Sequence, residues 1–294
     1  MAGSLSPIDT ALYQQDGFLF PIDVMSAAEA LALRQDIEAL EAGYPDGSLP
    51  QSLNQFFRVN GQIVLPLLAD IARHPAVLDA VESILGPDLL AWSVELFIKE
   101  PHTDKIVSWH QDLTYWGMGE TDDELTAWIA VSEASLASGC MRFVAGSHTQ
   151  AIQPHKDTFD GDNLLSRGQE LAVEVDEAEA TSITLKPGQM SLHHGRMFHA
   201  SGPNTSNDRR IGLAIRYVTP GVRQIVGARD YAMPVRGSDT SGNWVHVPRP
   251  SAPFAAEAMA LYDRVLADQS TALTAGAENA VGLYGTEAGM EQQP

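Results

Sequence analysis

The feature that most limits the fold of this chain is a change in the spacing of its apolar residues at about Leu85. Before this point apolar residues recur with helical spacing, and after it they fall in short runs separated by turns rich in Gly, Pro and Asp. This pattern is typical of an all-β sandwich or barrel. The expected strands are Leu89–Lys99, Ile106–Asp112, Leu125–Val131, Met141–Val144, Ala172–Val175, Gln189–His194 and Arg210–Val218.

The first 88 residues are expected to be mainly helical. A short helical pattern surrounds Ile8–Gln15, and Ser26 and Glu29 form a capping box that opens a second helix. Pro75–Leu85 begins with proline and is followed by glycine, as helices often are. Asn54–Val59 is expected to be a strand.

These elements predict a single domain over residues 1–270, mainly β with flanking helices. Helices occupy 1–88, the β-core lies at about 89–220, and a C-terminal extension with one amphipathic helix follows at 221–270. Residues 151–171 are polar and lack a period, which predicts a loop across the sheet edge. The tail, 271–294, is rich in Ala, Gly and Glu and is expected to be flexible.

Charge and composition limit the partners. The net charge of −20 disfavours nucleic acid, anionic membranes and highly anionic substrates such as coenzyme A thioesters. No apolar run is long enough to span a membrane, and the first residues lack the pattern of a signal peptide. Cys140 is the only cysteine, which excludes an internal disulfide. We therefore expect a cytoplasmic protein that acts on a small molecule.

The residues that point to chemistry are His110 and Asp112. Side chains two apart in a strand lie on one face, so this pair offers a nitrogen and an oxygen ligand to one metal ion. His199 is the candidate for the third ligand, and His193 and His194 rank lower because only His199 has an arginine at a suitable distance after it. Two histidines and one carboxylate are the ligand set of non-haem Fe(II) oxygenases.

Alternation in the last expected strand separates two adjacent arginines. Arg210 shares a face with Gly212, Ala214 and Arg216, whereas Arg209 shares the opposite face with apolar residues. Small residues beside charges are what a ligand cavity needs. Arg210 is therefore expected to face the cavity, where its planar guanidinium can bind a carboxylate.

With these residues in place, the chain resembles the phytanoyl-CoA dioxygenase family from about Asp16 to Tyr217. That family consists of Fe(II)- and 2-oxoglutarate-dependent oxygenases on a double-stranded β-helix, a jelly-roll core like that of cupins. Its co-substrate arginine lies eleven positions after the distal histidine, and eleven positions after His199 is Arg210. The motifs that carry the resemblance are His110-Gln111-Asp112, Thr126-Ala127-Trp128-Ile129-Ala130, Gly139-Cys140-Met141, Gly146-Ser147-His148 and His199-Ala200-Ser201-Gly202-Pro203-Asn204.

Carried over residue by residue, the resemblance implies that iron is held by His110, Asp112 and His199. Arg210 would bind the distal carboxylate of 2-oxoglutarate, and Ser201 and Trp128 would also contact this co-substrate. Arg58 matches a basic residue of similar role only loosely, and a solvated surface charge is the alternative.

The carboxylate at Asp112 also bears on the reaction that the resemblance implies. Related halogenases carry Ala or Gly at this position, which leaves room for a halide on the metal. A carboxylate there favours hydroxylation.

Two further residues are candidates for substrate contacts. Glu95 would share a strand face with Phe97 and Lys99, so it could bind a cationic group if that face lines the cavity, with a pairing to Lys99 or a solvated edge as the alternative. Trp116 could form an aromatic wall, which suits an ammonium group, or could pack in the core.

The expected function is that of an Fe(II)- and 2-oxoglutarate-dependent dioxygenase. It would use O2 to hydroxylate an unactivated C–H bond of a small metabolite and release succinate and CO2. Glu95 favours an amine-bearing substrate. The alternatives are a cupin-like metal-binding protein without oxygenase activity and a zinc-dependent hydrolase that uses the same ligands.

Overall fold

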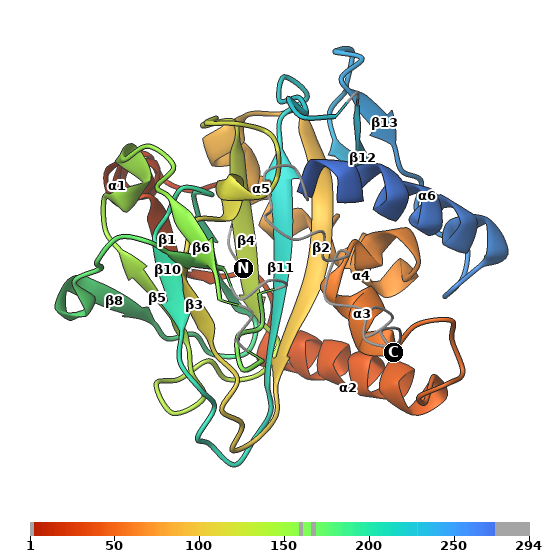
Figure 1. Cartoon of the computed structure of the whole chain (residues 1–294), viewed down its shortest axis with the longest axis horizontal. Coiled ribbons are helices and arrows are strands. Elements are labelled where there is room, and N and C mark those ends of the chain that lie inside the picture. The colour runs from red at the N-terminus through yellow and green to blue at the C-terminus, as the bar shows by residue number, and fades with distance from the viewer. Residues whose placement is uncertain (1–2, 159–160, 166–168, 228, 274–294) are drawn as a thin grey trace, which may run out of the picture.

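Two β-sheets form the centre of the computed structural model, which describes residues 3–158, 161–165, 169–227 and 229–273 (Figure 1). Within these residues the larger sheet has seven strands in the order β1-β9-β4-β11-β2-β12-β13, and the smaller has four in the order β3-β10-β5-β8. Strands β6 and β7 pair separately. The strands are β1 Phe18–Asp23, β2 Leu89–Lys99, β3 Val107–His110, β4 Glu124–Ala130, β5 Met141–Val144, β6 His155–Asp157, β7 Gln169–Leu171, β8 Ala180–Ile183, β9 Gln189–His193, β10 His199–Ser201, β11 Arg210–Val218, β12 Asp230–Arg236 and β13 Trp244–His246.

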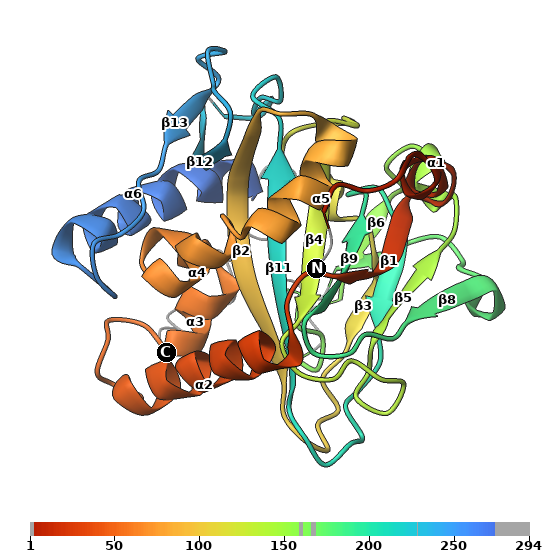
Figure 2. The same ribbon diagram turned by 180° about the vertical axis from the view of Figure 1, so that it is seen from behind.

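Helices cover one face of the larger sheet, as Figures 1 and 2 show from opposite sides. They bury a large apolar cluster against β2, β4 and β11. The α-helices are α1 Pro7–Asp16, which lies beside β1, and α2 Ala27–Gly43, α3 Leu53–Arg58, α4 Pro66–Ile71, α5 Pro75–Leu85 and α6 Ala256–Leu273, which pack on the sheet. The prediction of a mainly β fold with flanking helices is confirmed. None of the helices in the described part of the chain is both long and apolar enough to cross a bilayer.

The alternation predicted for β11 is also confirmed. Ile211, Leu213 and Ile215 are fully buried among the helices. Arg210 and Ala214 face the opposite side, where the smaller sheet lies and a pocket opens. The central strand of the larger sheet therefore separates an apolar core from a polar site.

The prediction of a strand at Asn54–Val59 is wrong, because this segment forms α3. Ser52 caps the helix, and its hydroxyl accepts a hydrogen bond from the Gln55 N–H at 3.3 Å. Phe56 and Phe57 are both buried in the helical layer. The cap and the buried phenylalanines outweigh the β-propensity of the aromatic residues.

The prediction of a loop over 151–171 is partly wrong. His155–Asp157 and Gln169–Leu171 form the hairpin strands β6 and β7, whereas the predicted strand Ala172–Val175 lies outside the strands. Strands of three residues are too short to leave an alternating pattern in the sequence.

The C-terminal extension contributes more to the sheet than predicted. Strand β12 pairs with β2, and β13 pairs with β12, so the larger sheet extends beyond residue 220. Residues 274–294, which make up most of the predicted flexible tail, lie outside the described residues.

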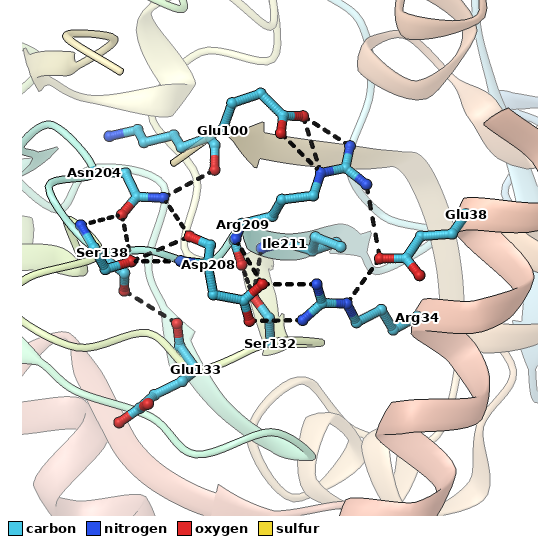
Figure 3. A network of polar contacts seen from close by, with 12 residues as sticks. Arg34, Glu38, Glu100, Ser132, Glu133, Ser138, Asn204, Asp208, Arg209 and Ile211 are labelled. Carbon is cyan, nitrogen blue, oxygen red and sulfur yellow. Dashed lines mark hydrogen bonds and ion pairs between the residues drawn. The ribbon is translucent and has the colours of Figure 1, made fainter. Parts of the chain in front are cut away.

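A network of ion pairs joins α2 to the turn before β11 (Figure 3). Both terminal nitrogens of Arg34 lie 2.7 Å from carboxylate oxygens of Asp208. Arg209 forms paired contacts with Glu41, at 2.7 and 2.8 Å, and with Glu100, at 2.9 and 3.0 Å. The network directs Arg209 outwards and holds the backbone from which Arg210 enters the pocket.

Candidate metal centre

The three predicted metal ligands lie together between the two sheets. His110 ends β3, Asp112 begins the following 3-10 turn, and His199 begins β10, directly opposite His110 in the register of the sheet. Their ligand atoms all lie within 4.8 Å of one another, and all three residues are buried. His110 Nε2 and Asp112 Oδ1 are 3.4 Å apart, close to the separation of about 3 Å expected for neighbouring ligands on one ion.

Hydrogen bonds from the backbone orient both imidazoles. His110 Nδ1 lies 2.8 Å from the Ser108 carbonyl, and His199 Nδ1 lies 3.0 Å from the Met197 carbonyl. Because a carbonyl can only accept, each Nδ1 carries the proton and each Nε2 keeps its lone pair. Burial, followed by the neighbouring His110, holds the pKa of His199 well below its usual range, which favours the neutral ligand form. This donor set fits a divalent iron ion.

Asp112 lies in a buried network of charged groups. Burial alone would raise its pKa, but the Arg216 guanidinium and the neighbouring imidazoles hold the pKa of this carboxyl well below its usual range. Arg216 lies 3.7 Å from Asp112 and 2.9 Å from Glu95. His193 lies 3.9 Å from the second Asp112 oxygen. Asp112 is therefore ionised, as a metal ligand must be.

Arg210, Trp128 and Ser201 form the side of the pocket beside the triad. Arg210 is 1% exposed, donates to the Gly139 carbonyl at 2.6 Å, and its guanidinium lies 5.5 Å from the centre of the Trp128 ring. Ser201 is two residues from His199 on β10. The three triad residues and Arg210, Ser201 and Trp128 thus all line one pocket.

Three other predicted residues are buried nearby but do not line this pocket. Arg58 is not a solvated surface charge: it is 8% exposed, lies 4.2 Å from the centre of the Phe97 ring, and donates to the Leu164 carbonyl at 2.7 Å. Trp116 packs against Trp92 and lies over the Arg216 guanidinium, with 5.0 Å between the tryptophan rings.

Glu95 is the third of these residues. It shares the face predicted for it, but it pairs with Arg216 rather than with Lys99 or solvent, and it accepts from the Ser93 hydroxyl at 2.9 Å. Its carboxylate is thus occupied by groups of the protein.

The structure adds residues that the sequence alone did not assign. Arg216 and His193 line the pocket next to Asp112, and Val107, Met141 and Leu165 form apolar walls. The alternation along β11 already places Arg216 on the same face as Arg210. Leu165 carries no comparable signal, because its segment is placed by long-range hydrogen bonds such as those from Leu164 N–H to the Ile106 carbonyl and from Arg58 to the Leu164 carbonyl.

Gly212 makes room for Trp128, and this leads to a prediction. A Cβ on Gly212 would lie 1.8 Å from Cζ2 of the Trp128 ring. We expect Gly212→Ala to displace the indole, to destabilise the fold by about 1–3 kcal/mol, and to weaken 2-oxoglutarate binding. Denaturant unfolding and calorimetry would measure both effects. Gly43→Ala, at a position with open space, is the control. Unchanged binding would show that Trp128 does not shape the co-substrate site.

Comparison with known proteins places the chain among iron-dependent oxygenases. The family model described as phytanoyl-CoA dioxygenase matches residues 13–212. A probable alpha-ketoglutarate-dependent hypophosphite dioxygenase from Stutzerimonas stutzeri is 28% identical over 233 residues, which cover 74% of this chain and 80% of that protein. The apo structure of the non-heme monooxygenase ThoJ is 33% identical, with a TM-score of 0.81 and coverage of 90% and 97%. CytC3 with Fe(II) and alpha-ketoglutarate, at 22% identity, 87% and 98% coverage and a TM-score of 0.64, shares the fold.

Proposed function

The chain belongs to the phytanoyl-CoA dioxygenase family, and on this premise we propose that it hydroxylates a C–H bond of a small metabolite and releases succinate and CO2. The enzyme class is that of the 2-oxoglutarate-dependent dioxygenases. The observation that carries the proposal is the convergence of His110, Asp112 and His199 beside Arg210 in one buried pocket.

In this proposal the ligand triad and Arg210 have defined roles. His110, Asp112 and His199 would hold Fe(II), and Arg210 would bind the distal carboxylate of 2-oxoglutarate. Bound iron supplies the activation of O2 that is coupled to decarboxylation of the keto acid.

The remaining groups orient the reactants and exclude water. Arg216 is paired with Glu95, and this pairing fixes the guanidinium that lies beside Asp112. The guanidinium in turn orients the Asp112 carboxylate. The apolar side chains of Val107, Met141 and Leu165 would shield the site from solvent.

The substrate that we propose is compact. The pocket is lined mainly by buried side chains, and the net charge of −20 opposes a coenzyme A thioester. The charged groups of the pocket give an amine-bearing substrate no support, because the Glu95 carboxylate is already paired with Arg216. We therefore propose a small metabolite as the substrate and assign it no particular functional group.

A screen for succinate release tests the proposal. The purified protein, loaded with Fe(II) and supplied with 2-oxoglutarate and O2, should release succinate slowly alone and faster with a compact metabolite. Phytanoyl-CoA should not stimulate it. If no succinate is released, with or without candidate substrates, the result would contradict an oxygenase and favour a metal-binding protein. Hydrolysis indifferent to 2-oxoglutarate and O2 would favour a hydrolase.

A further inference from the structure

Lys99 is a buried lysine whose side chain faces the cation Arg210. In the register of β2 and β11 it lies directly opposite Arg210, and the two residues are 0% and 1% exposed. Like charges at directly opposed positions destabilise a sheet. Within the described residues neither side chain has a carboxylate within 4.0 Å. A charged Lys99 is therefore unfavourable in the protein alone, and an anion between or beside the two side chains would stabilise it.

The contacts of Lys99 lead to the pocket through Ser201. The ammonium donates to Ser201 Oγ at 2.7 Å and also to the Gly202 carbonyl. In its charged form the Lys99 ammonium can only donate, so the Ser201 oxygen then acts as the acceptor. The hydroxyl proton must then point elsewhere, and among the described residues it has no acceptor. Ser201 lines the pocket, whereas Lys99 lies behind it.

We propose that Lys99 is a positioning residue for the co-substrate: it turns the Ser201 hydroxyl proton towards the carboxylate held by Arg210 and adds a second positive charge behind it. This inference rests on the proposed function, since it takes 2-oxoglutarate as the anion. Lys99 itself does not touch the co-substrate. Its effect on binding passes through the Ser201 hydrogen bond and through the electric field at that side of the pocket.

The proposed role predicts a change in the protonation of Lys99 when the co-substrate binds, and this change can be measured. Burial, and after it the neighbouring Arg210, lowers the pKa of Lys99 to about 6. Arg58 lowers it further and Cys140 opposes this effect, so the groups that face the ammonium from each side leave it mostly neutral above pH 7 when no anion is present. A bound carboxylate favours the charged form and raises this pKa.

Co-substrate binding should therefore take up protons. Between about pH 6.5 and 8 the affinity for 2-oxoglutarate should rise as the pH falls, and it should level off below about pH 6, where Lys99 is already charged in the free protein. The carboxylic groups of 2-oxoglutarate do not titrate in this range.

Oxygen-free calorimetry tests the inference on the Mn(II)-loaded protein, with 2-oxoglutarate as the titrant. At pH 7.5, titrations in two buffers of different ionisation enthalpy should show uptake of about one proton per co-substrate bound by the wild type. Lys99→Met should weaken binding about ten- to hundredfold and should abolish the proton uptake. Lys186→Met, which removes an exposed lysine, should change neither quantity.

A double-mutant cycle tests the route through Ser201. If Lys99 acts through this hydroxyl, the loss of affinity in the variant with both Lys99→Met and Ser201→Ala should be smaller than the product of the two single losses. Strictly multiplicative losses would overturn the route through Ser201.

The remaining outcomes separate this inference from the proposed function. Binding with no proton uptake by the wild type would overturn the charge role, and this measurement does not depend on whether a variant folds. Unchanged affinity in Lys99→Met would overturn the inference and leave the proposed function intact. A wild type that binds no 2-oxoglutarate would overturn both.

Discussion

Asp112→Ala is expected to abolish succinate release and Fe(II) binding while the fold is retained. The substitution removes the only carboxylate of the triad. Loss of residues that merely support metal ligands typically costs 10- to 100-fold in metal affinity or activity, so loss of a ligand should cost more than about a hundredfold. The fold should persist, because Arg216 keeps Glu95 as a partner at 2.9 Å. Calorimetry with Fe(II) under anaerobic conditions and circular dichroism measure the two effects.

Two further variants make this result specific. Asp112→Asn keeps the volume of the side chain but removes its charge, and it should fail in the same way. Asp36→Ala removes an exposed carboxylate of α2 and should leave metal binding unchanged. If Asp112→Ala bound Fe(II) as tightly as the wild type, Asp112 would not be a metal ligand.

Arg210→Ala is the second substitution with a large expected effect. It should weaken 2-oxoglutarate binding thirtyfold or more, since removing one partner of a buried charge pair costs about 2–5 kcal/mol. Arg210 is 1% exposed, so water cannot easily replace its guanidinium. Fe(II) binding to the triad should be much less affected. Titration of the metal-loaded protein with 2-oxoglutarate measures the change.

Arg209→Ala is the matched control, because it removes the same side chain one residue earlier. Arg209 does not line the pocket: it pairs with Glu41 and Glu100, and Figure 3 shows its guanidinium between Glu100 and Glu38. The affinity for 2-oxoglutarate should therefore stay within about twofold. Stability should fall by up to about 1 kcal/mol for each half-exposed ion pair lost. If Arg209→Ala rather than Arg210→Ala weakened binding, the assignment of faces on β11 would be wrong.

The parts of the site that follow from alternation could be predicted from the sequence. In β11, side-chain direction depends only on parity, so the separation of Arg209 from Arg210 needs no tertiary information. Asp112 reaches the same side as His110 although it lies in a 3-10 turn beyond the end of β3. The two side chains therefore lie on one side as predicted, although the strand ends at His110, before Asp112.

The partners of the charged residues could not be predicted in this way. Glu95 is paired with Arg216, because the register of β2 on β11 sets Arg216 opposite Ser93, two residues from Glu95 on the same face. Register between strands distant in sequence depends on the whole sheet and on a bulge at its end. The prediction of an amine-bearing substrate required a free Glu95 carboxylate, and the sequence did not reveal its pairing with Arg216.

The helical layer shows a second limit. The aromatic residues of α3 favour a strand by propensity, yet packing against Tyr262 and Phe254 places Phe56 in a helix. Tyr262 belongs to α6, near the other end of the described chain. Contacts at such separation override local propensity and leave no trace in a short window of sequence.

The most direct test of the central claim is an anaerobic spectroscopic titration of the protein with Fe(II) and 2-oxoglutarate. We predict a weak visible charge-transfer band that appears only when both are present, that is absent in Asp112→Ala, and that needs much more 2-oxoglutarate in Arg210→Ala. Fe(II) bound by the wild type with no spectral response to 2-oxoglutarate would contradict a shared site for the metal and the keto acid.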